Sequence, residues 1–109
     1  MKTLFLNQSQ IEHFDEFGFL PPVRVLATDE AISLRAEVED FEARHPELAG
    51  QLDFKANLIL PAVDRLSRDN RLLNLMEDLL GPNLLHWNST FRIKESNTGQ
   101  HAAWHQDTA

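Results

Sequence analysis

The residues best suited to chemistry lie near the end of the sequence, in the run His105-Gln106-Asp107. If this run forms a strand, residues two apart point to the same face, so the imidazole of His105 and the carboxylate of Asp107 converge. Such a pair, joined by a second histidine from elsewhere, makes the two-histidine, one-carboxylate arrangement that holds Fe(II) and leaves coordination positions open. A His-x-Asp pattern alone recurs by chance in many proteins, so its context decides what it means.

A second grouping of the same residues adds His101, which lies four positions before His105. Together with Asp107 these histidines offer three ligands within one short stretch, a set that suits zinc. A fully extended chain places His101 about 13 Å from His105, which makes a three-ligand site on one strand geometrically awkward. The zinc site remains an alternative to the iron site.

The composition limits what else the protein does. The chain has 109 residues, a formal net charge of −7 and no cysteine, so any metal must be held by histidine and carboxylate. An acidic chain with scattered basic residues argues against binding to nucleic acid or to an anionic membrane. No apolar run approaches the roughly 20 residues that span a bilayer. We therefore expect a cytoplasmic protein that binds neither nucleic acid nor a membrane; the oligomeric state is not predicted.

Four stretches have the pattern of helices. Apolar residues at helical spacing and capping residues predict helices over Ser9–Phe17 and Asp29–Arg44. The helical pattern resumes at Pro61, and a leucine-rich helix follows Asp69 or Asn70 and ends before Gly81. Acidic residues in the second of these helices are expected to form only its solvated face: Glu37, Glu39, Asp40 and Glu42.

The pattern changes after residue 82. Apolar and polar side chains alternate over residues 85–94, and a period of two predicts a strand. A polar loop over residues 95–100 leads into a second predicted strand over residues 101–107. We therefore expect an α+β fold in a single segment, helical over 1–82, with the start of a β core over 83–109 that is cut off within the sheet.

Residues 58–107 resemble the phytanoyl-CoA dioxygenase family of Fe(II)/2-oxoglutarate oxygenases. The matching motif is Trp87-Asn88-Ser89-Thr90-Phe91-Arg92-Ile93-Lys94-Glu95, followed after a short polar loop by Trp104-His105-Gln106-Asp107. The leucine-rich helix that ends in Gly81-Pro82-Asn83 precedes it, and the N-terminal helices are also similar. The order and spacing of these pieces make the resemblance fairly specific over nearly the whole chain.

The resemblance implies a double-stranded β-helix (jelly roll) core with Fe(II), 2-oxoglutarate and O2 as cofactor and co-substrates. His105 and Asp107 are then the first two iron ligands. The polar face of the strand before them is then the candidate 2-oxoglutarate site, formed by Asn88, Thr90, Arg92 and Lys94. Related halogenases carry a small residue in place of the carboxylate, so Asp107 favours hydroxylation.

The family takes its second histidine ligand, and the arginine that grips the distal carboxylate of 2-oxoglutarate, from downstream strands. Neither follows Asp107 in these 109 residues, so we expect the chain alone to be inactive. The predicted function is hydroxylation of a small organic or lipid-like substrate. The alternative is a non-catalytic remnant or interaction domain that binds a partner through an open sheet edge.

Overall fold

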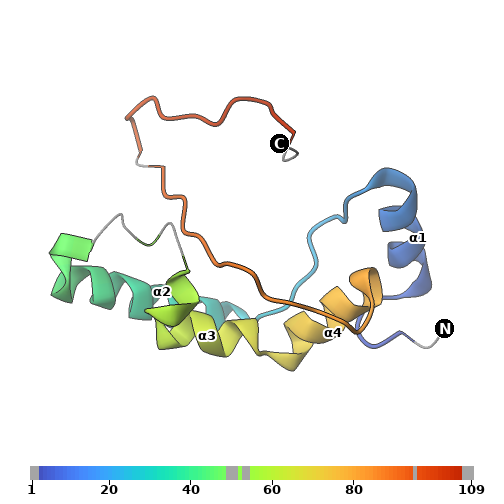
Figure 1. The fold of residues 1–109 in the computed structure, drawn as a ribbon. Helices are drawn as coiled ribbons and strands as arrows, with labels where there is room; N and C mark the ends of the chain where they lie inside the picture. The colour runs from blue at the N-terminus through green and yellow to red at the C-terminus, as the bar shows by residue number, and fades with distance from the viewer. Residues whose placement is uncertain (1–2, 49–51, 53–54, 95, 107–109) are drawn as a thin grey trace.

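The protein is described by a computed structural model that covers residues 3–48, 52, 55–94 and 96–106. The helices of the described chain all lie between residues 8 and 80, and an extended segment follows them (Figure 1). The elements are α1 (Gln8–Phe17), α2 (Thr28–Arg44), the short 3-10 helices η1 (Pro46–Leu48) and η2 (Ala56–Leu58), α3 (Pro61–Ser67) and α4 (Asn70–Leu80).

Local capping chemistry sets the ends of the helices. Asn7 caps α1 by accepting a hydrogen bond from the Gln10 backbone N–H at 2.9 Å. Gly18 ends the same helix in the left-handed conformation that glycine adopts without strain. Helix α2 begins one residue earlier than predicted, because Glu30 accepts a hydrogen bond from the backbone N–H of Ala27. All four predicted helices are confirmed.

The helices form an elongated body. Helix α2 packs against α3, α3 contacts α4, and α1 packs beside α4 (Figure 1). The radius of gyration is 16.4 Å, whereas a closed domain of this length has about 13 Å. The end of the extended segment, coloured red, accounts for part of the difference because it runs away from the helices (Figure 1).

The main hydrophobic core lies between α2, α3 and the connection that joins them. Leu52, Ala56 and Leu60 are each at most 3% exposed and form its centre. Four partly buried side chains pack around them: Val38, Phe41, Val63 and Phe91. This core therefore draws on α2, η2, α3 and the extended segment.

Polar contacts join the parts that this core does not reach. The carboxylate of Asp78 on α4 accepts hydrogen bonds at 2.7–2.8 Å from three consecutive backbone N–H groups, those of Leu4, Phe5 and Leu6. These bonds hold the N-terminal residues against α4 and bring Leu6 to 2% exposure.

A second polar contact ties the start of α2 to the start of α4. The guanidinium of Arg71 donates to both carboxylate oxygens of Glu30 at 2.9 Å and to the carboxylate of Asp69, the N-cap of α4. These hydrogen bonds lower the pKa of Asp69 to about 2 and also lower the pKa of Glu30. The three side chains therefore remain charged and paired throughout the physiological range.

The predicted α+β fold is wrong for the described residues, which contain helices and no strand. Residues 83–94 and 99–106 contain neither helix nor strand, and a turn at residues 96–98 lies between them; no β-ladder joins them, and the expected start of a jelly roll is not present there (Figure 1). The reason is that a strand needs a hydrogen-bonded neighbour. With the other described residues, the first stretch forms only two backbone hydrogen bonds: the Ala56 N–H donates to the Ser89 carbonyl oxygen, and the Phe91 N–H donates to the Leu52 carbonyl oxygen.

The strand predicted from the alternation over residues 85–94 is therefore wrong, and its apolar face is buried only in part. Phe91 packs on the helical core, but Leu85 and Trp87 are 83% and 78% exposed. Within the part of the chain that the structure describes, no helix is long and apolar enough to cross a membrane.

Candidate functional site

His105 is exposed, and the backbone defines its tautomer. Its Nδ1 lies 2.8 Å from the carbonyl oxygen of Ala103. A carbonyl oxygen only accepts hydrogen bonds, so Nδ1 carries the proton in this contact and Nε2 of the neutral ring carries the lone pair. Metal-binding histidines are oriented in this way, with the other ring nitrogen donating to a carbonyl or carboxylate. The geometry of His105 therefore fits a ligand that binds through Nε2.

Asp107, the second predicted iron ligand, lies outside the described residues. Among the residues that are described, no group of three or more His, Cys, Asp and Glu side chains could hold a metal ion. His101 is exposed, with its Nδ1 at 3.4 Å from the Gly99 carbonyl oxygen. The iron pair and the three-ligand zinc alternative both need Asp107, so both stay predictions.

Asn88 is the first residue of the polar face predicted to bind 2-oxoglutarate. Both polar atoms of its side-chain amide already have hydrogen-bond partners. Its Oδ1 accepts from the backbone N–H of Lys55 at 2.6 Å, and its Nδ2 donates to Thr90 Oγ1 at 3.1 Å. Lys55 adopts a left-handed backbone conformation (φ 52°), which is uncommon for a residue other than glycine. The Asn88 side chain therefore holds the strained backbone at Lys55 against the extended segment and orients Thr90.

The remaining two residues of this face, Arg92 and Lys94, are exposed cations. Within the described ranges no hydrogen bond or ion pair engages either side chain. Other cations of this acidic chain are paired with carboxylates at 2.6–3.1 Å: Arg35, Arg44, Arg65, Arg68 and Arg71. Residues two apart on an extended chain share a face about 7 Å apart, so Arg92 and Lys94 together present two positive charges suited to an anion.

The neighbouring positions have structural contacts. His86 Nε2 lies 2.8 Å from Ser89 Oγ, so this histidine has a hydrogen-bonding role. The Lys55 ammonium lies 5.8 Å from the centre of the Trp87 ring, within the range of a cation–π interaction. Together with the Asn88 bond, these contacts anchor the near end of the polar face to the helical body.

Sequence reasoning missed one charged residue of interest. Glu42 was expected on a solvated helix face, but it is half-buried and lines a cavity between α2, α3 and the extended segment. Helical spacing alone does not reveal this, because Phe91, which lines the other side of the cavity, lies 49 residues further along the sequence.

Comparisons with known proteins point to one enzyme. The chain is 26% identical over 115 aligned positions to ectoine dioxygenase of Bordetella parapertussis and, equally, to that of Bordetella bronchiseptica. The alignment covers 94% of this chain but only 37% of each relative, so the chain spans little more than a third of their length.

Other comparisons add no assignment. No family model matches the chain, and no solved structure matches it. Ectoine dioxygenase is itself a member of the phytanoyl-CoA dioxygenase family. The resemblance noted from the motifs is thus supported as a distant one: the chain is similar to the N-terminal third of such a dioxygenase.

Proposed function

We propose that this chain supplies the first part of the active site of an Fe(II)/2-oxoglutarate-dependent dioxygenase that hydroxylates a small organic or lipid-like substrate. The observation that carries the proposal is the exposed His105, whose Nδ1 lies 2.8 Å from the Ala103 carbonyl oxygen, the kind of contact that orients metal-binding histidines. The similarity to two ectoine dioxygenases along nearly the whole chain supports it.

In this proposal His105 Nε2 and the carboxylate of Asp107 hold the iron from one face. A second histidine, from the length that the relatives have beyond the matched part, completes the set. When bound, the iron supplies the oxidative chemistry with O2 and 2-oxoglutarate, and the protein supplies an open site and the orientation of the reactants.

The two cations are the groups of this chain best placed to bind the co-substrate. 2-Oxoglutarate is a dicarboxylate, and charge-assisted hydrogen bonds from Arg92 or Lys94 would hold one end of it. Thr90 adds a hydroxyl oriented by Asn88. Because both polar atoms of the Asn88 amide already have partners, we propose that Asn88 acts mainly by positioning Thr90. The name of the relatives makes ectoine the first substrate to test.

Calorimetric titration with Fe(II) under anaerobic conditions, in the presence of 2-oxoglutarate, tests this proposal. We expect binding to the unmodified chain and a loss of affinity of at least about tenfold in His105→Ala, because even outer-shell partners of a metal site contribute this much. His86→Ala is the matched control, since it removes another exposed histidine. Equal affinities of the His105→Ala variant and the unmodified chain would rule out the iron assignment.

A second candidate function is a protein-interaction module, favoured by the outer side of the extended segment. The backbone groups of residues 88, 90 and 92 have no hydrogen-bond partner among the described residues, and Leu85 and Trp87 beside them are largely exposed. Such a backbone can pair with a strand of another protein.

This second candidate predicts that the chain self-associates or captures extended segments. We expect light scattering to show oligomers that grow with protein concentration, and Trp87→Lys to reduce them because a lysine on an exposed edge opposes strand pairing. Ile32→Lys, at an exposed apolar residue of α2, is the control. A single monomeric species at all concentrations would exclude this function.

A further inference from the structure

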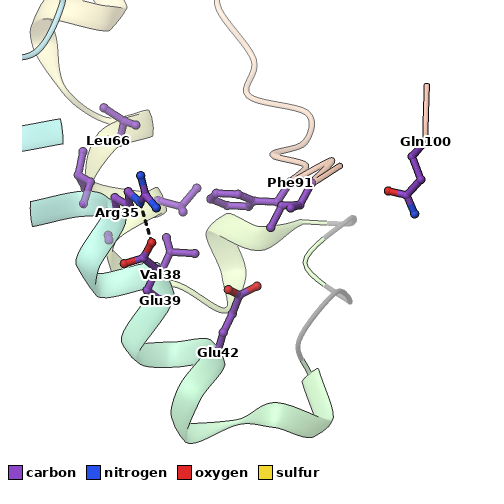
Figure 2. A pocket seen from close by; sticks show the side chains of 11 residues that line it. Arg35, Val38, Glu39, Glu42, Leu66, Phe91 and Gln100 are labelled. Carbon is purple, nitrogen blue, oxygen red and sulfur yellow. Dashed lines mark hydrogen bonds and ion pairs between the residues drawn. The ribbon is translucent and has the colours of Figure 1, made fainter. Parts of the chain in front are cut away.

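A large cavity lies between the helices and the extended segment. It has a volume of about 910 Å³, and most of its surface is apolar. Leu34 and Val38 come from α2, Val63 and Leu66 come from α3, and Phe91 reaches in from the extended segment (Figure 2). His105 is not among the residues that line it. The volume is in the range of sites that enclose small molecules, which is about 300–1,000 Å³.

Three charged residues at successive turns of α2 form one side of this cavity. Arg35 and Glu39 are joined by an ion pair at 2.6 Å, drawn as a dashed line in Figure 2. Their charges therefore offset each other. Glu42 is different, because no hydrogen bond or ion pair engages its carboxylate anywhere in the described part of the chain.

The other acidic residues of this helix show how unusual Glu42 is. Glu37, Glu39 and Asp40 are exposed, and each is paired with an arginine. Glu42 combines partial burial with the absence of such a partner, and it faces the cavity across from Phe91 (Figure 2). A carboxylate in this position loses part of its hydration without gaining a compensating contact.

We propose that this cavity is a binding site for a small amphipathic organic cation. The apolar part of the ligand would fill the space between Val38, Val63 and Phe91, and its ammonium or amidinium group would pair with Glu42. Charge complementarity selects a cation: with Arg35 and Glu39 offsetting each other, the cavity carries one negative charge. An anionic or neutral ligand of the same shape would leave Glu42 unpaired. This site goes beyond the proposed dioxygenase function and does not depend on it.

The experiment is a titration of the full chain, labelled with nitrogen-15, with n-heptylammonium at neutral pH. n-Heptanol and n-heptanoate serve as probes of the same length with no charge and with the opposite charge. We expect heptylammonium to shift the amide signals of Val38, Val63 and Phe91, and to bind roughly three- to tenfold more tightly than heptanol, as a partly buried charge pair does. Added salt should weaken the ammonium complex alone.

Substitutions then locate the charge. Glu42→Gln should reduce the affinity for heptylammonium to that for heptanol, and Glu42→Asp, which keeps the charge, should retain most of it. Glu16→Gln, at an exposed acid of α1, is the matched control and should bind as the unmodified chain does. Failure of heptylammonium to shift the cavity residues, or equal affinity for the three probes, would overturn the proposal without any variant. Unchanged binding by Glu42→Gln would overturn it as well.

Discussion

Leu60→Ala is expected to lower the free energy of unfolding by about 2–5 kcal/mol, the usual cost of removing a buried leucine. Leu60 is 3% exposed and forms the centre of the main core with Leu52 and Ala56. Few hydrophobic side chains among the described residues are fully buried, and a loss of this size is a large fraction of a small domain's stability.

Urea unfolding followed by circular dichroism measures this change. Leu58→Ala is the matched control, because Leu58 is also a leucine beside this core but is 75% exposed. The control should alter the unfolding midpoint little. Since Phe91 packs on the same cluster, Leu60→Ala should also loosen the extended segment, seen as a change in Trp87 fluorescence. Equal stability of the two variants would show that this cluster does not hold the fold together.

Asp78→Asn is expected to release the N-terminal residues from α4 at a cost of about 1–2 kcal/mol, allowing for solvent at a partly exposed site. The carboxylate accepts three backbone hydrogen bonds, from Leu4, Phe5 and Leu6. An asparagine has only one acceptor oxygen, and its amide group would face a backbone N–H donor. Hydrogen exchange of these three amides measures the release, and Glu77→Gln on the same helix is the control.

The same contact predicts a dependence on pH. Burial acts to raise the pKa of Asp78, but the three backbone N–H groups outweigh it and the pKa lies below its ordinary value of 3.8. The stabilisation is therefore complete at neutral pH, declines below about pH 4 and disappears as the pH falls through the folded-state pKa. Asp78→Asn should remove this part of the acid sensitivity. An unchanged acid transition in the variant would contradict the role given to the carboxylate.

Local signals in the sequence were sufficient for the helices. Asn7, Gly18 and Gly81 act at helix ends through hydrogen bonds and backbone conformations that involve only their near neighbours. For the same reason the error at the start of α2 was a single residue.

The candidate site was predictable only in part. The residue types of His105, Arg92 and Lys94, and the distant similarity that they support, are present in the sequence itself. Two hydrogen bonds could not be predicted from the sequence: the one that orients His105 and the one between the Lys55 N–H and the Asn88 side chain. Both depend on where the backbone places a carbonyl or an N–H group.

The sequence by itself therefore determined the helices and the chemical types available for metal and anion binding. The tertiary structure alone decided that the extended residues form no sheet in the described chain, that Trp87 is exposed and that Glu42 lines a cavity. The physical reason is the range of the interactions. Caps and periodicity act within a few residues, whereas a β-ladder, a buried face and a cavity each need a second segment that the local sequence does not specify.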